Sequence, residues 1–163
     1  FIFFFIFIIL YFFLLFFLKI DYFYGSLFFL PHAVRIIAAL IYGWIVFPGL
    51  LLAHLFCDLY FFNNHNYILV LYGSTVVFIV IEILKIFNVF DLKNFTNLNF
   101  IHVIFIVLLS AIFNSVGSFV IADYYGNINS LNFITSYFIG DFLGGFIGLY
   151  LFLKIFYRFF IIP

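Results

Sequence analysis

Long apolar runs separated by short polar stretches fill the sequence, and this pattern limits what the chain can fold into. Hydrophobic residues make up 69% of the chain and charged residues 7%, far below the charged content of about 25% in ordinary globular domains. The mean hydropathy is +1.40. Such a chain belongs in lipid, where backbone polar groups must be satisfied within the protein. Because the runs lack the alternation of barrel strands, we expect transmembrane α-helices.

Six stretches are long and apolar enough to cross a membrane, since a hydrocarbon core of about 30 Å needs about 20 apolar residues per helix. The predicted spans cover residues 1–20, 24–43, 44–62, 67–88, 99–121 and 132–157. We therefore predict an all-α, polytopic transmembrane helical bundle of about six spans. It forms a single integral membrane domain over residues 1–163.

The first apolar run is predicted to be a span and not a signal peptide. It is longer than the apolar region of about 7 to 15 residues in signal peptides, and no small-residue cleavage site follows it. The sequence contains no methionine, so we expect the start of the natural protein to be missing or processed.

The second and third predicted spans are separated only by Gly43 and Trp44, and Pro48 and Gly49 follow at once. Proline has no backbone N–H and interrupts or starts a helix. We therefore predict either a tight hairpin or a broken, partly re-entrant pair of helices at this point.

The distribution of lysine and arginine predicts the orientation, because positively charged loops stay in the cytoplasm. With six spans, one side receives Lys85, Lys93, Lys154 and Arg158, and the other side receives Lys19 alone. We expect both termini to be cytoplasmic.

Several classes of function are not indicated by the sequence. The six basic and six acidic residues are scattered, so we expect no binding of nucleic acid. The single cysteine, Cys57, excludes a disulfide within the chain, and no two histidines have metal-ligand spacing on one helix. No catalytic or nucleotide-binding motif occurs, so we expect neither an enzyme nor a bound metal or cofactor.

Ionisable side chains inside membrane spans are costly, so each is a candidate for function. Arg35 lies in the second span and Asp141 in the last, and an ion pair would neutralise both charges. Three interpretations stay open: a structural ion pair, a ligand-binding Arg35 or Asp141, and separate roles without a pair.

Two further pairs are suggested by helical spacing. His54 and Asp58 are four residues apart, so they share a helix face and could form a hydrogen-bonded pair. Because histidine titrates near neutral pH, that pair could relay or sense protons, with a simple interfacial hydrogen bond as the alternative. Glu82 and Lys85, three residues apart near a span end, are predicted to form a structural ion pair.

Glycines at four-residue spacing, Gly140, Gly144 and Gly148, form a stripe on the last span. Such a stripe lets another helix approach the backbone closely. The partner could be a helix of the same chain or of a second copy; we favour the same chain, because Asp141 lies beside the stripe. Small and polar residues at 114–118 are predicted to bond a neighbouring helix.

Two stretches carry short motifs. The first is 31–49, with Pro31, Arg35, the small-residue segment 38–40 and the pattern Gly43-x-x-x-x-Pro48-Gly49. The second is 136–144, with the pattern Gly140-Asp141-x-x-Gly144. Both resemble elements of the membrane-associated sensor domains of the first MASE class, which precede histidine kinase or diguanylate cyclase modules in bacteria. The chain departs from that pattern in being shorter and in placing its tryptophan at position 44.

The resemblance implies a multi-pass protein of the bacterial inner (plasma) membrane that senses an unknown signal. Besides the lipid bilayer, it implies a cytoplasmic signalling protein or a second copy as partner, because these residues include no output domain. It singles out Pro31, Arg35, Pro48, Gly49, Gly140, Asp141 and Gly144. We expect the hairpin and the last span to converge, so that a small ligand or a proton perturbs an Arg35–Asp141 pair and shifts helix packing.

Two other functions stay open. One is the substrate-binding membrane subunit of an energy-coupling-factor importer, which is also a six-helix bundle and packs on its partner through small-residue stripes. The other is a structural membrane protein in which Arg35 and Asp141 only set the fold. The sensor interpretation predicts a cytoplasmic signalling partner, and the transport interpretation predicts a ligand-sized polar cavity and an ATPase partner.

Overall fold

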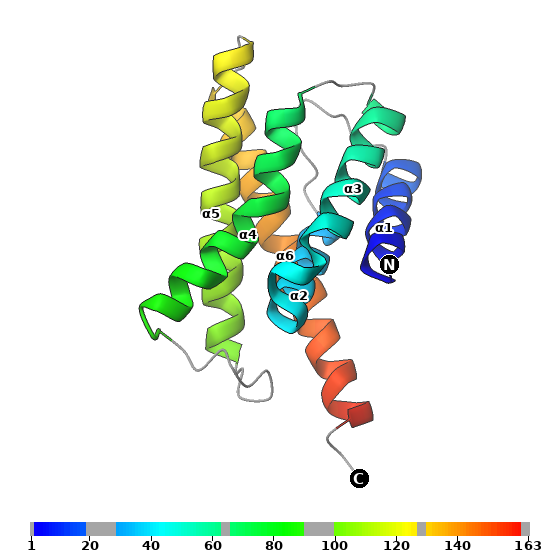
Figure 1. Ribbon diagram of the computed structural model, residues 1–163, viewed down its shortest axis with the longest axis vertical. Coiled ribbons are helices and arrows are strands. Elements are labelled where there is room, and N and C mark those ends of the chain that lie inside the picture. The colour runs from blue at the N-terminus through cyan, green and yellow to red at the C-terminus, as the bar shows by residue number, and fades with distance from the viewer. Residues whose placement is uncertain (1, 19–28, 63–65, 90–99, 127–129, 161–163) are drawn as a thin grey trace.

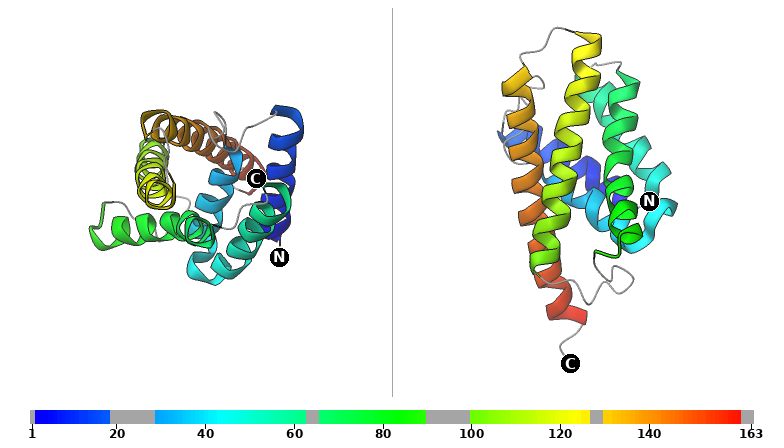
Figure 2. Two further views of the ribbon diagram at one scale, coloured as in Figure 1. Left: turned by 90° about the horizontal axis from the view of Figure 1, so that it is seen from above. Right: turned by 90° about the vertical axis from the view of Figure 1, so that its left-hand side faces the viewer.

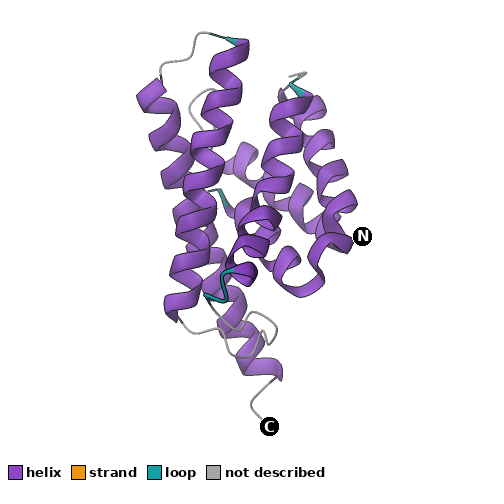
Figure 3. Cartoon of the chain, turned by 60° about the vertical axis from the view of Figure 1, so that its left-hand side comes forward, coloured by secondary structure: helices purple, strands orange, loops and turns teal. Residues whose placement is uncertain are grey.

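The computed structural model describes residues 2–18, 29–62, 66–89, 100–126 and 130–160 (Figure 1). All regular elements in these ranges are helices, as Figure 3 shows, which confirms the all-α prediction. They are α1 (Ile2–Leu18), α2 (Leu30–Tyr42), the 3-10 helix η2 (Gly43–Val46), α3 (Phe47–Cys57), the π-helical η3 (Asp58–Phe62), α4 (Tyr67–Ile86), α5 (Phe100–Tyr125) and α6 (Ser130–Phe160).

Four of the described helical segments are long and apolar enough to cross a membrane. They are Leu30–Tyr60, Tyr67–Ile86, Phe100–Tyr125 and Asn132–Ile155, and a shorter apolar helix covers Ile2–Phe12. A multi-pass membrane protein is compatible with these helices. The predicted number of six spans is not confirmed, because the second and third predicted spans fall within the one segment Leu30–Tyr60.

The backbone is interrupted between α2 and α3. Gly43 has φ of +58° and ψ of −144°, a conformation that glycine adopts without the penalty of a Cβ, and it ends α2. Pro31 and Pro48 lie in the first turns of α2 and α3, where a missing N–H leaves no helical bond unmade. The interruption lies where the sequence predicts a hairpin, but a hairpin that crosses the membrane twice is not confirmed.

The lengths of these two helices explain why. At 1.5 Å per residue, the 13 residues of α2 and the 11 residues of α3 extend about 20 Å and about 16 Å, less than a hydrocarbon core of about 30 Å. Hydropathy registers how apolar a stretch is and not where its helix axis turns. The sequence therefore overestimates the length of each helix on either side of Gly43.

Helix α2 lies in the middle of the bundle. Every residue from Pro31 to Ala39 is buried, so all faces of this helix are covered. It packs against α6, α1 and α4, while α3 packs against α1 and α4, and α5 against α4 and α6. Seen from above in Figure 2, the other five α-helices surround α2.

Polar side chains lie inside this bundle and large apolar side chains lie outside. The buried polar and charged residues are His32, Arg35, Asp58, Ser74, Ser110, Asn114, Ser115, Ser118 and Asp141. On the outside, Ile9 of α1 is 64% exposed and Ile101 of α5 is 69% exposed. Charged residues are almost never fully buried in water-soluble proteins unless paired, whereas in membranes they face the bundle interior.

Helices α4 and α6 run in the same direction and α5 runs opposite to them (Figures 1 and 2). Lys85 is in the last turn of α4, and Lys154 is close to the C-terminal end of α6. These two lysines therefore lie toward the same end of the bundle, the lower end in Figure 1. Lys19 and Lys93 lie outside the described residues.

Candidate functional site

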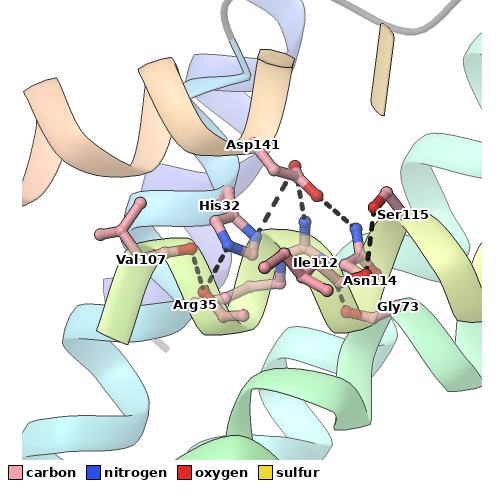
Figure 4. Close-up of polar contacts among 9 residues, drawn as sticks. His32, Arg35, Gly73, Val107, Ile112, Asn114, Ser115 and Asp141 are labelled. Atoms are coloured by element: carbon pink, nitrogen blue, oxygen red, sulfur yellow. Dashed lines mark hydrogen bonds and ion pairs between the residues drawn. The ribbon is translucent and has the colours of Figure 1, made fainter. Parts of the chain in front are cut away.

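Arg35 and Asp141 meet in the centre of the bundle. Arg35 Nη2 lies 3.8 Å from Asp141 Oδ1, and each side chain is 3% exposed. Arg35 comes from α2 and Asp141 from the middle of α6 (Figure 4). The ion pair predicted from the sequence is therefore present, which contradicts the interpretation in which the two residues have separate roles without a pair.

Arg35 is held by two further groups. Its Nη1 donates a hydrogen bond to the backbone carbonyl of Gly73 in α4. A Cβ at position 73 would lie 3.5 Å from Arg35 Nη1 and 3.0 Å from His54 Cε1, so glycine leaves room between two rigid groups. On another side, Arg35 Cζ lies 5.4 Å from the ring centre of Phe29, within the range of a cation–π contact.

Asp141 receives three partners, which come from two helices. Asn114 of α5 donates a hydrogen bond from Nδ2 to Asp141 Oδ2 over 2.5 Å. His32 of α2 places Nδ1 3.7 Å from Asp141 Oδ1, the same oxygen that faces Arg35. A buried carboxylate needs such partners, because desolvating an unpaired charge costs several kcal/mol, about 3–5 when one partner of a pair is removed.

His32 is a site residue that the sequence did not identify. It is fully buried, and its Nε2 lies 2.9 Å from Ser110 Oγ of α5. The sequence alone assigns it no role, whereas the structure places it in the first turn of α2, inside the bundle. The available signal was its spacing: His32 is three residues before Arg35, so both share one face of a helix.

We call these five residues the Asp141 cluster: His32, Arg35, Ser110, Asn114 and Asp141. Three of its buried polar atoms have no hydrogen-bond partner among the described residues, namely His32 Nδ1, Arg35 Nε and Asn114 Oδ1. An unsatisfied buried polar atom costs about 1–3 kcal/mol, so it calls for an explanation. The cluster is thus charged, buried and incompletely hydrogen-bonded.

The glycine stripe of α6 brings α2 close enough for these contacts. The N–H of Phe29 donates to the carbonyl of Gly140 over 2.9 Å. A Cβ on Gly144 would overlap the backbone of Phe29, and a Cβ on Gly148 would overlap Cβ of Ala33. The stripe therefore packs within the chain, as predicted.

Gly49 differs from the stripe. A Cβ added there would meet no atom within 4 Å, so close packing does not require glycine at this position. The predicted packing role of Gly49 is not supported. Pro48, the residue before it, lies in the first turn of α3, a position that favours proline.

His54 and Asp58 lie outside the Asp141 cluster. His54 Nδ1 lies 3.0 Å from Ser74 Oγ of α4, and the ring packs 5.9 Å from the ring of Phe7. Asp58 is buried and opens the π-helical η3, where a wider turn replaces α-helical spacing. The predicted His54–Asp58 pair stays a prediction.

The Glu82–Lys85 ion pair predicted near the end of the fourth span is confirmed. Lys85 Nζ lies 2.8 Å from Glu82 Oε1, and both side chains are 39% exposed. Its exposure separates it from the buried pair, since ion pairs in contact with solvent stabilise little.

The chemistry available to the Asp141 cluster is a change of charge. One cation, one carboxylate and one imidazole meet where α2, α5 and α6 come together, so gaining or losing a charge alters the attraction between α2 and α6.

Among the described residues, no group of three His, Cys, Asp or Glu side chains could hold a metal ion. No model of a known protein family, no curated protein and no solved structure matches this chain.

Proposed function

We propose that this protein is an integral membrane sensory domain of the MASE type, in which the Asp141 cluster responds to the signal. One observation carries the proposal: the two stretches that resemble that family, 31–49 and 136–144, meet at this cluster. They are joined by the Arg35–Asp141 ion pair, and Phe29, two residues before the first stretch, donates a hydrogen bond to Gly140 in the second. The cluster is also the meeting point of helices that are far apart in the sequence.

A buried ion pair is suited to signalling because its two states differ strongly in energy. While both charges are present, Asp141 offsets the charge of Arg35 inside the bundle. Neutralising one partner leaves the other unpaired in a medium that solvates it poorly, so the old packing of α2 on α6 becomes unfavourable. A signal that binds or removes one charge therefore shifts the population of helix arrangements.

Helix α6 would carry this shift to the membrane surface. Its 31 residues extend about 46 Å at 1.5 Å per residue. It protrudes beyond the other helices at the lower end of the molecule (Figure 1). Four aromatic rings along it, Phe138, Phe142, Phe146 and Tyr150, stack at successive turns with interplanar angles of 14°, 14° and 16°.

We also propose that the chain crosses a bacterial inner membrane with both termini cytoplasmic, and that α2 and α3, each too short to cross alone, form the broken, partly re-entrant pair. Lys85 and Lys154 lie toward one end of the bundle, the side expected to face the cytoplasm. Exposed tyrosines lie in η3, at the start of α4 and at the end of α5, on the opposite side, where an interfacial aromatic belt belongs: Tyr60, Tyr67, Tyr124 and Tyr125.

Cysteine labelling tests this orientation. In a Cys57→Ala background, Lys154→Cys and Tyr125→Cys are each exposed to a membrane-impermeant thiol reagent in intact cells and in inverted vesicles. We expect Tyr125→Cys to react in cells and Lys154→Cys to react only in inverted vesicles. Labelling of both from the same side contradicts the proposed topology.

The sensory function is tested by purifying the full chain from its native membrane in a gentle detergent and identifying bound proteins by mass spectrometry. We expect a kinase or a cyclase, and we expect its activity to change with Asp141→Asn but not with Glu82→Gln, which alters the exposed pair. Recovery of ATP-binding subunits instead would favour the transport function. If the activity of the partner is unchanged by Asp141→Asn, the cluster has a structural role only.

A further inference from the structure

We infer that His32 and Asp141 form a proton-binding site in which one proton is held between His32 Nδ1 and Asp141 Oδ1. The inference deepens the proposed function, on which it rests for its biological meaning, by naming the ligand of the Asp141 cluster as a proton. It adds His32 as the residue that receives this ligand.

The hydrogen bonds of Ser110 decide which ring nitrogen carries the proton in neutral His32. Ser110 Oγ donates to the carbonyl of Val107 over 3.1 Å and lies 2.9 Å from His32 Nε2. A hydroxyl has one proton, so a serine that donates to Val107 must accept from His32. The proton of neutral His32 is then on Nε2, and Nδ1 presents a lone pair.

That lone pair faces a carboxylate. His32 Nδ1 lies 3.7 Å from Asp141 Oδ1 and has no hydrogen-bond partner among the described residues. Two acceptors facing each other repel. The neutral ring can instead carry its proton on Nδ1, which then faces Asp141 as a donor. In that case Nε2 must accept a hydrogen bond from Ser110, and the hydrogen bond from Ser110 to the carbonyl of Val107 is lost.

Protonated His32 satisfies all three contacts together. Nε2–H donates to Ser110, Ser110 donates to Val107, and Nδ1–H points at Asp141 (Figure 4). The proton comes from water and binds the Nδ1 lone pair, and no other bond forms or breaks. The opposing effect is charge: with Arg35 and ionised Asp141 the site is neutral, and the added proton makes it +1 inside the bundle.

Groups from every neighbouring helix set this balance. Burial opposes the proton most and Arg35 of α2 opposes it as well, whereas Asp141 of α6, 3.7 Å away, favours it. Around Arg35 stand Tyr11 of α1, Tyr137 of α6 and His54 of α3, each of which interacts with its charge. From α5 the site receives the neutral groups Ser110 and Asn114, and from α4 the carbonyl of Gly73.

Proton binding has a structural consequence because one oxygen serves two cations. Asp141 Oδ1 lies 3.7 Å from His32 Nδ1 and 3.8 Å from Arg35 Nη2. Protonated His32 competes with Arg35 for this oxygen, so Asp141 moves toward His32 and its bond to Arg35 weakens. Since His32 and Arg35 are one helical turn apart on α2, this exchange shifts α6 along α2.

The test is a histidine titration by NMR. The full chain, labelled with ¹⁵N in its four histidines, is placed in lipid nanodiscs, and the His32 ring signals are identified by their loss in His32→Gln. We expect His32 to change from neutral to protonated as the pH is lowered from about 8 to about 4. The step should be lost in Asp141→Asn and kept in Asp123→Asn, which removes an exposed carboxylate at the end of α5.

A His32 that keeps one protonation state throughout this range in the unmodified protein overturns the inference, as does a step that persists in folded Asp141→Asn. If Asp141→Asn loses its thermal transition, Ser110→Ala replaces it as the informative variant. It keeps the carboxylate and frees Nε2, so the step should remain but occur at another pH, and an unaltered step counts against the inference. The titration uses no signalling partner, so its failure is separate from failure to recover a kinase or cyclase.

Discussion

Two histidines of the bundle, the buried His32 and the half-buried His54, each face a serine on a neighbouring helix, and the surroundings of the two rings differ. His32 Nε2 lies 2.9 Å from Ser110 Oγ, and His54 Nδ1 lies 3.0 Å from Ser74 Oγ. Beyond its serine, the ring of His32 faces the carboxylate of Asp141, whereas the ring of His54 packs against Phe7. The same pair of residue types thus lies against a carboxylate in one place, and against an aromatic ring and near the charge of Arg35 in the other.

The role of a polar pair in a membrane bundle therefore depends on the charged or apolar groups next to the pair. An interhelical hydrogen bond in a bilayer contributes about 0.6–2 kcal/mol and fixes how two helices pack. An ionised pair next to it, such as Arg35 and Asp141, makes the same hydrogen bond depend on charge.

The largest effect is expected from removing the carboxylate. Asp141→Ala leaves Arg35 buried without its counter-charge, so the free energy of unfolding should fall by about 3–5 kcal/mol, measured by denaturation in mixed detergent micelles. The double variant Arg35→Met with Asp141→Leu removes both charges and should recover part of this loss. If Asp141→Ala and the double variant are equally stable, the pair does not set the stability of the α2–α6 contact.

The next effect comes from forcing α2 and α6 apart. Gly144→Ala puts a Cβ against the backbone of Phe29, and overpacking of this kind costs about 1–3 kcal/mol. Gly49→Ala is the matched control, because a Cβ there meets no atom within 4 Å. In a helix, alanine is favoured over glycine by up to about 1 kcal/mol, so this control should be neutral or more stable. Thermal unfolding measures the stability of both variants. If Gly49→Ala is less stable than Gly144→Ala, the close packing assigned to Gly144 is wrong.

The two histidines are compared directly by His32→Ala and His54→Ala. Each variant loses one bond to a serine, but His32→Ala also removes a neighbour of Asp141. We expect His32→Ala to lower the free energy of unfolding by about 1 kcal/mol more than His54→Ala. Equal losses, measured side by side in the same detergent, would mean that Asp141 adds nothing to the His32 contact.

The smallest effect is expected at the exposed ion pair. Glu82→Gln removes a charge from a pair that is 39% exposed, where solvent already screens the interaction. The expected loss is about 0.5 kcal/mol or less, and it should shrink further at high salt. A loss comparable to that of Asp141→Ala would show that burial does not distinguish the two pairs.

The sequence predicts the helical bundle and its central ion pair, because lipid leaves few choices. Apolar runs have to be helical, and an arginine inside a span needs an anionic partner, for which Asp141 beside a glycine stripe was a natural candidate. The role of His32 could not be predicted in the same way. It depends on α2 starting within the bundle, which follows from how α6 approaches Phe29 and not from local hydropathy.

Two other predictions depended on geometry that spacing does not carry. The α-helix continues as far as Asp58, whose N–H bonds the carbonyl of His54, but Asp58 also opens a π-helical turn, so spacing alone does not decide whether the two side chains meet. Likewise, the number of spans depends on the backbone of Gly43, whose positive φ ends α2 after 13 residues. Sequence patterns indicate that a stretch is apolar, while tertiary packing decides where its helix stops.

The turn after α2 gives the protein a spectroscopic property of its own. Trp44 is the single tryptophan of the chain, and its indole stacks on Phe78 of α4 at 5.1 Å and meets Phe47 edge-on at 5.7 Å. The turn is the direct continuation of the helix that carries His32 and Arg35. A rotation of α2 would change the packing and polarity around the indole, so the wavelength of its fluorescence would follow that rotation without an attached dye.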